Sequence, residues 1–155
     1  MTILITGGLG FIGSNTTISL LNYGYEVLIV DSLINSNVKT LDLIKSIYKK
    51  IEVKKANLYF RKGDLRDHIW LKKIFKEFEH KHKPIKSIIH LAGLKSVRES
   101  VLNPYKYWDH NLNSTLNLLK IMSEFECENF IFSSSATINK PNEAKLSEVS
   151  QLGPI

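Results

Sequence analysis

The chain has 155 residues, of which 43% are hydrophobic, and this is enough for one domain with a buried core. Its 21 Lys and Arg outnumber its 15 Asp and Glu, but the basic residues lie in separate runs without aromatic residues between them, so we expect no nucleic-acid partner. A single cysteine, Cys127, and the lack of a membrane-length apolar stretch predict a soluble cytoplasmic protein without disulfides, metal or membrane partner.

The first predicted element is a buried strand, Ile3 to Thr6, that runs directly into a glycine-rich turn and then into a helix over Ser14 to Tyr23. Two dinucleotide-binding patterns fit the turn, one through Gly8, Gly10 and Gly13 and one through Gly7, Gly10 and Gly13. Such glycines permit a tight turn and the close approach of a diphosphate to the N-terminus of the helix. A glycine turn in a fold that binds no nucleotide remains the alternative.

A second buried strand, Val27 to Val30, supports the nucleotide interpretation. It ends in Asp31, which lies 18 residues after Gly13. This spacing is close to the roughly 20 residues expected for the acid that binds the adenosine ribose hydroxyls. An acid at this position favours NAD over NADP.

Further strands are predicted to alternate with helices along the rest of the chain. The strands are Leu58 to Lys62, Ser87 to Leu91 and Phe130 to Ser133, and the helices are Leu41 to Lys49, Ile69 to Glu79 and Tyr105 to Phe125. This alternation predicts an α/β fold with a doubly wound parallel sheet of the Rossmann type.

The longest predicted helix carries apolar residues at intervals of three or four. We expect this stripe to face the core: Tyr105, Trp108, Leu112, Leu116, Leu119 and Met122. Its polar residues fit solvated positions: His110, Asn111, Asn113 and Asn117. An alternative for Asn111 is that it binds backbone groups at a site.

The loops after strands three to five should meet at one edge of the sheet, where ligands bind. Asp64 is placed to accept from an adenine amine, whereas Asp67 is expected to cap the next helix. Lys95 either brings a cation to the ribose and phosphates or is an ordinary exposed lysine. The hydroxyls of Ser133 to Thr137 either crowd the mouth of the cleft or bind nearby backbone.

Six segments together resemble the UDP-glucose 4-epimerases, which belong to the extended short-chain dehydrogenases/reductases. The segments are Thr6 to Gly13, Asp31 to Ser36, Gly63 to Arg66, His90 to Ser100, Tyr107 to Asn111 and Phe130 to Thr137. The stretch Ala92 to Ser100 is similar to the 4-epimerases rather than to the sugar dehydratases or uronate epimerases.

The resemblance implies an NAD cofactor, a UDP-sugar substrate and a set of site residues. Ser135 is implied as a catalytic hydroxyl that binds the developing alkoxide at C4 of the hexose. The implied cofactor-binding residues are Gly7, Gly10, Phe11, Ile12, Gly13, Asp31, Ser32, Leu33, Ile34, Asn35, Ser36, Asp64, Leu65, Leu91, Ala92, Gly93, Leu94, Lys95 and His110. In the family reaction, hydride leaves C4 for NAD and returns to the opposite face of the 4-keto sugar.

The family's catalytic Tyr-x-x-x-Lys pair does not occur in this sequence, because none of the six tyrosines is followed by lysine four residues later. We therefore expect residues 1–155 to be an incomplete NAD-binding domain, the N-terminal portion of an epimerase without its substrate domain. The fifth strand would then be an open edge of the sheet.

The sequence also departs from the family pattern at Arg98, at His110 and at 138–140. These departures concern the sugar side of the cleft. Three alternatives remain open for the chain as a whole. The chain is a non-catalytic NAD-binding module, or it is half of a split enzyme that pairs with a C-terminal half, or it is another sugar-nucleotide enzyme such as a 4,6-dehydratase. A homodimer is equally compatible with the sequence.

Overall fold

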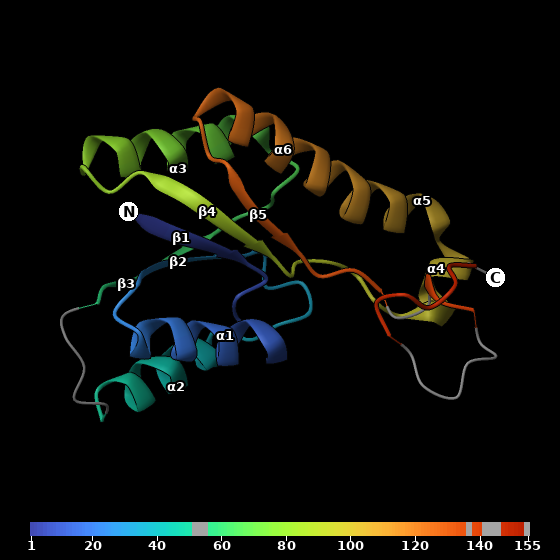
Figure 1. The fold of residues 1–155 in the computed structure, drawn as a ribbon, viewed down its shortest axis with the longest axis horizontal. Coiled ribbons are helices and arrows are strands. Elements are labelled where there is room, and N and C mark those ends of the chain that lie inside the picture. Colours follow the sequence, from blue (N-terminus) through green and yellow to red (C-terminus); the bar gives the residue numbers. More distant parts are fainter. Residues whose placement is uncertain (51–55, 136–137, 141–146, 154–155) are drawn as a thin grey trace.

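The computed structural model describes residues 1–50, 56–135, 138–140 and 147–153. Its centre is a five-stranded sheet in the order β3-β2-β1-β4-β5, with every pair of neighbours parallel (Figure 1). The strands are β1 (Thr2–Thr6), β2 (Glu26–Asp31), β3 (Leu58–Lys62), β4 (Ile85–His90) and β5 (Asn129–Phe132). The predicted doubly wound parallel sheet is confirmed.

Helices cover both faces of the sheet. α1 (Phe11–Asn22) and α2 (Lys39–Tyr48) lie on one face, and α3 (His68–His80) and α6 (Ser114–Glu124) lie on the other (Figure 1). Asp67 begins α3 as expected, because its side chain accepts from the backbone N–H of Trp70 over 2.9 Å.

The predicted single helix over Tyr105 to Phe125 is divided into three segments. α5 (Pro104–Trp108) leads into η1 (Asp109–Asn113), a turn of π-helix, and only then does α6 begin. A short helix that the sequence analysis did not predict, α4 (Val97–Leu102), precedes them. Figure 1 shows α6 and α5 as one rod that extends past the sheet toward α4.

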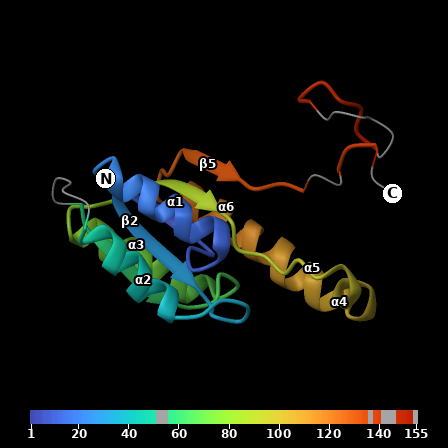
Figure 2. The ribbon, with the colours of Figure 1, turned by 90° about the horizontal axis from the view of Figure 1, so that it is seen from below.

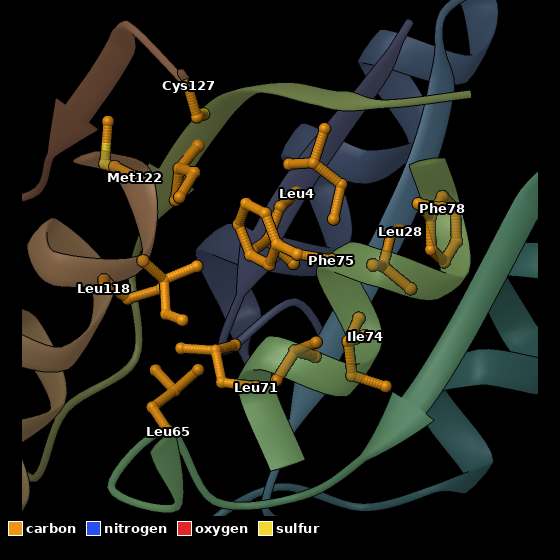
Figure 3. Close-up of a cluster of buried hydrophobic side chains, with 14 residues drawn as sticks. Leu4, Leu28, Leu65, Leu71, Ile74, Phe75, Phe78, Leu118, Met122 and Cys127 are labelled. Atoms are coloured by element: carbon orange, nitrogen blue, oxygen red, sulfur yellow. The ribbon is translucent and has the colours of Figure 1, made fainter. Parts of the chain in front are cut away.

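Two apolar clusters fill the space between the sheet and its helices. On the α3 and α6 face, Phe75 projects from α3 toward Leu4 of β1, and Leu118 of α6 lies nearby (Figure 3). On the other face, Ile5 and Ile29 pack under α1 and α2. Cys127 is a free thiol in the first cluster, and burial raises its pKa to about 11, so it is protonated and inert at neutral pH.

The expectation that the long apolar stripe faces the core is wrong for most of its members. Tyr105, Trp108, Leu112, Leu116 and Leu119 are exposed, and only Met122 is buried. The buried side of α6 is instead formed by Ser114, Leu118, Ile121 and Met122. Both sides of this helix carry apolar residues at helical spacing, so periodicity does not indicate which side packs on the sheet.

β5 is an edge strand of the described sheet, as expected. Ile131 and Phe132 are 62% and 53% exposed. The segments 138–140 and 147–153 lie beyond the carboxyl end of this strand, away from the sheet (Figure 2), and Asn139 forms an isolated antiparallel bridge with Leu152. Among the described residues, no helix has the length and apolarity needed to span a membrane.

Candidate functional site

A cleft of about 970 Å³ opens at the carboxyl ends of the strands, where the chain order reverses between β1 and β4. This is the place where ligands bind in doubly wound sheets. The cleft has the size of a cofactor site. Its lining comes from the glycine turn, from the loops after β2, β3, β4 and β5, and from η1 and the start of α6.

The glycine turn forms the floor of the cleft. Gly7 has a φ of +66°, and a Cβ there would lie 2.8 Å from the backbone N of Ala92, so only glycine fits. Gly10 differs, because a Cβ there would meet only the carbonyl O of Gly7, at 3.2 Å, and would otherwise project into open space. Gly10 is therefore a position where a side chain would occupy the cleft rather than break the fold.

α1 presents an uncapped N-terminus to this turn. Gly10 is its N-cap, no side chain caps the helix, and its first turn contains no acidic residue. The first-turn N–H groups of Phe11, Ile12 and Gly13 have no partners inside the helix, and all three residues line the cleft. The positive end of the helix dipole and these N–H groups together form a site for a diphosphate.

Asp31 joins the glycine turn to the loop after β2. Its Oδ2 accepts from the backbone N–H of Leu9 over 3.0 Å, and its Oδ1 accepts from Leu33 N (2.9 Å) and from the Ser36 hydroxyl (2.7 Å). The side chain is only 6% exposed, yet it borders the cleft. Asp31 thus organises the two loops as well as offering its remaining lone pairs to a ligand.

The loop after β4 is held from two sides. Asn111 of η1 accepts from Leu94 N over 2.8 Å and donates to Leu94 O over 2.9 Å. The side-chain amide of Asn35, from the loop after β2, donates to Gly93 O over 3.3 Å. Asn111 therefore binds backbone groups at the site and does not occupy an ordinary solvated position. Lys95, next in this loop, lines the cleft and forms no ion pair with any described residue.

Asp64 is already engaged by a neighbouring guanidinium. Arg66 donates to both carboxylate oxygens of Asp64 and also to Asp109 of η1, so it ties the loop after β3 to the π-helical turn. These hydrogen bonds lower the pKa of Asp64 and raise that of Arg66. Asn117 reinforces the connection, since its side chain donates to Leu65 O and Arg66 O. The solvated position expected for Asn117 is therefore wrong.

His90, at the end of β4, lines the back of the cleft and is 2% exposed. Its ring nitrogens contact the hydroxyls of Thr6 (2.6 Å) and Thr115 (3.0 Å). Burial lowers its pKa to about 4, so the imidazole is neutral at physiological pH. No role for His90 is predicted from the sequence, where the only available signal is a histidine near the end of a buried strand at the ligand edge of the sheet.

The structure brings nearly all predicted site residues to this one cleft, including His110 and, at its mouth, Ser135. Leu33 and Ser36 are the exceptions. Leu33 has a φ of +64° and packs against the α1 and α2 cluster, and Ser36 supports Asp31. Ala136 and Thr137 lie outside the described residues. In the described part of the chain no three His, Cys, Asp or Glu residues are placed to hold a metal ion.

These features fit an extended dinucleotide. The uncapped helix end suits its diphosphate, and the open space at Gly10 leaves room for the diphosphate oxygens. Asp31 on one side suits ribose hydroxyls, and the loop from Leu91 to Lys95 lines the opposite half. Chemically, the described lining of the cleft supplies groups that can bind and orient such a ligand.

Comparisons with known proteins agree with this geometry. A family model described as GDP-mannose 4,6 dehydratase matches residues 4–155. A UDP-glucose 4-epimerase of Haemophilus influenzae is 47% identical over 138 residues, covering 89% of this chain and 38% of the relative. UDP-glucose 4-epimerase GEPI42 of Cyamopsis tetragonoloba is 41% identical over 152 residues, covering 97% of this chain and 41% of the relative.

A solved structure of UDP-glucose 4-epimerase from Bifidobacterium longum, in complex with NAD+ and UDP, is also similar. It superimposes with a TM-score of 0.87 at 40% identity, covering 99% of this chain and 43% of that one. The chain thus spans about two fifths of the length of the relatives that it matches.

Proposed function

The chain belongs to the family whose model is described as GDP-mannose 4,6 dehydratase, and from this premise we propose that it is the NAD-binding part of a UDP-hexose 4-epimerase. The observation that carries the proposal is the uncapped N-terminus of α1 in a cleft of dinucleotide size, beside a buried Asp31. The epimerase assignment rests on relatives that are 41% and 47% identical and carry that name.

Each part of NAD has a set of groups to hold it in this proposal. The N–H groups of Phe11 and Ile12 bind the diphosphate. Asp31 and Ser32 bind the adenosine ribose, with Asp64 and Leu65 beside the adenine. The loop from Leu91 to Lys95 and His110 border the nicotinamide half. A carboxylate at Asp31 disfavours the 2′-phosphate of NADP.

When bound, NAD supplies a hydride acceptor for C4 of the hexose. The contribution of this chain is to orient the cofactor and to place the Ser135 hydroxyl at the mouth of the cleft, where it hydrogen-bonds the sugar oxygen. The sequence contains no Tyr-x-x-x-Lys pair to take the proton. We therefore propose that residues 1–155 bind the cofactor without turnover and that the remaining catalytic groups come from outside them.

Calorimetric titration of NAD into the chain tests the binding proposal. Wild-type protein is expected to bind, and Gly10→Ala is expected to weaken binding at least about tenfold, a loss of about 1.4 kcal/mol, because the new methyl group occupies the diphosphate position. Gly24→Ala is the matched control: it removes a glycine at the far end of α1 where nothing lies within 4 Å. If wild-type protein binds no NAD while folded, the proposal fails.

A 4,6-dehydratase is the second candidate, because the matching family model carries that description. The two reactions leave different products from UDP-glucose, namely UDP-galactose and a 4-keto-6-deoxy sugar nucleotide. When purified from its native cells together with the part that supplies the remaining catalytic groups, the protein should form UDP-galactose from UDP-glucose in the presence of NAD. The 4-keto-6-deoxy product would assign it to the dehydratases, and binding of NAD without any product would favour the non-catalytic module.

We further propose that a second copy of the chain covers the outer apolar stripe of α4, α5, η1 and α6. The stripe members recur at intervals of three or four: Val97, Val101, Tyr105, Trp108, Leu112, Leu116 and Leu119. Exposed apolar residues at this spacing are typical of helix–helix contacts, although α4 is a separate helix that ends before Asn103, and monomers rarely expose so many apolar residues along one set of helices. A two-fold axis would bring two such stripes together.

Light scattering after size exclusion tests this dimer. The wild type is expected at twice the chain mass, and Leu116→Lys at the mass of one chain. Leu43→Lys, on the exposed side of α2, is the control and should leave the dimer intact. A monomeric wild type would contradict the proposal.

A further inference from the structure

The hydrogen bonds around His90 have only one consistent set of donors. Thr115 Oγ1 donates to Asn111 O over 2.8 Å, and a threonine hydroxyl has a single proton. The contact of Thr115 Oγ1 with His90 Nε2 at 3.0 Å therefore requires that Nε2 carries a proton and donates it. In a neutral imidazole the other nitrogen, Nδ1, is then an acceptor.

The hydrogen bond at the other ring nitrogen, Nδ1, completes the series of donors and acceptors. The Thr6 hydroxyl lies 2.6 Å from His90 Nδ1 and must donate to it. Thr6 Oγ1 in turn accepts from the backbone N–H of Ala92 over 3.3 Å. The hydrogen bonds thus run from Ala92 N–H through Thr6, His90 and Thr115 to the carbonyl of Asn111, with every hydroxyl proton used once.

This series of hydrogen bonds contacts the loop after β4 at two points. It begins at Ala92, and it ends at Asn111, whose side chain binds both backbone groups of Leu94. Between them, Gly93 packs against the Asn111 side chain, with an added Cβ only 3.4 Å from its Oδ1. The imidazole of His90 joins Thr6 of β1 to Thr115 of α6, and the Thr115 hydroxyl continues the connection to the Asn111 carbonyl in η1.

Nothing charged faces the ring in the described part of the chain. Its contacts are Thr6 from β1, Thr115 from α6, and the rings of Phe130 and Phe132 of β5 at 6.0 and 5.7 Å. Burial is the cause of its low pKa, and no charged neighbour contributes. The surroundings therefore favour one neutral tautomer, because a second ring proton would face the proton that Thr6 now donates.

We propose that His90 is a positioning residue: as the neutral Nε2–H tautomer it fixes the spacing between the loop after β4 and the π-helical turn, and thereby sets the affinity of the cleft for its dinucleotide. The part concerning affinity rests on the proposed function. The tautomer of His90 and the rate of amide exchange in the loop do not depend on the proposed function, since both are properties of the chain without a ligand.

The tautomer is tested by ¹⁵N NMR of histidine-labelled wild-type chain without NAD at neutral pH. The His90 ring is expected to show a protonated Nε2 and an unprotonated Nδ1. A protonated Nδ1, in either the neutral or the charged ring, would overturn the proposal.

The coupling to the loop is tested with Thr115→Val, which keeps the shape of the side chain but removes its donor and acceptor. Amide exchange at Leu94 should become faster without NAD, and the dissociation constant for NAD should rise about tenfold, as expected for the loss of one buried hydrogen bond. Thr115→Ser, which retains the hydroxyl, should restore both values.

Thr2→Val is the matched control. It removes a buried hydroxyl that donates to Lys83 O over 2.9 Å at the opposite end of β1. It is expected to lower the melting temperature without changing Leu94 exchange or NAD affinity. Unchanged exchange at Leu94 in a folded Thr115→Val variant would overturn the proposal, whereas a wild type that binds no NAD would defeat only the proposed function.

Discussion

The carboxylate of Asp31, at the end of β2, accepts the backbone N–H of Leu9 in the glycine turn over 3.0 Å. The two residues are separated by α1 in the chain, so this hydrogen bond, together with the one from Gly7 N to Val30 O, closes the first β-α-β unit at its ligand end. Through its other oxygen Asp31 also holds the loop after β2. The acid that a nucleotide ribose would contact is therefore part of the scaffold that shapes the cleft.

Asp31→Asn is expected to destabilise the fold before any ligand is added. The amide keeps the size of the side chain, but its NH2 group would face a backbone N–H or the Ser36 hydroxyl where an oxygen now accepts. We expect a loss of about 2–3 kcal/mol in the free energy of unfolding by urea, as for hydrogen bonds to a buried charged group. Asp42→Asn, on the exposed side of α2, should change it by less than about 0.5 kcal/mol. Equal effects of the two changes would refute a scaffold role for Asp31.

Gly7→Ala and Gly24→Ala separate backbone strain from steric clash. Both positions have positive φ, +66° and +81°, so each alanine is expected to cost about 1–2 kcal/mol from strain. A Cβ at Gly7 would also lie 2.8 Å from Ala92 N, whereas one at Gly24 meets nothing within 4 Å. Thermal unfolding should therefore show a clearly larger loss for Gly7→Ala. Equal losses would show that β1 and β4 are not packed as closely as described.

Leu118→Ala and Leu119→Ala test which side of α6 packs on the sheet. Leu118 is fully buried and Leu119 is 45% exposed. Truncating the buried side chain is expected to cost about 2–5 kcal/mol, and truncating the exposed one at most about 0.5 kcal/mol. The measurement is urea unfolding at dilutions where the chain is monomeric. The reverse order would restore the original expectation that the outer stripe faces the core.

Stability should rise with pH between about pH 4 and 6.5 because of His90. The pKa of His90 is lowered from 6.5 to about 4 in the native state, so in this window the unfolded chain binds a proton that the folded chain does not. By linkage the unfolding free energy falls as the pH drops from 6.5 toward 4, by about 3 kcal/mol over the whole window.

Urea midpoints at pH 5 and pH 7 measure this change in stability. NMR of the histidine rings shows whether His90 is the group responsible. The His90 ring should retain the shifts of the neutral form at pH 5 in the folded chain. A ring that titrates near pH 6.5 while the chain stays folded would be incompatible with its burial between Thr6, Thr115 and the rings of β5.

The sequence was sufficient to predict those features that depend on local pattern. The buried run before the glycine turn, its distance to Asp31 and the alternation of strands and helices predict the sheet and the edge at which the cleft lies. Asp67 is a further example, since its position before an apolar period predicts a cap that the structure confirms.

Features that depend on tertiary contacts were not predictable in the same way. α6 is apolar on two sides, so the choice of Leu118 rather than Leu116 for the core depends on how η1 rotates the helix relative to α5. The π-helical turn is supported by the hydroxyls of Ser114 and Thr115, which bind the carbonyls of His110 and Asn111.

The contact of His90 with Thr6 also cannot be predicted from local sequence pattern, because it joins residues 84 positions apart. Only the pairing of β1 with β4 brings them together. The sequence indicates this contact only by placing a polar residue, Thr6 or His90, at the end of each of the two strands.

Crystals of the 155-residue chain grown with NAD would show directly whether the cleft holds the dinucleotide. We expect a diphosphate within hydrogen-bond distance of the N–H groups of Phe11 and Ile12, with the adenosine ribose against Asp31. An ordered cleft that stays empty at saturating NAD, or a dinucleotide bound elsewhere on the chain, would contradict it.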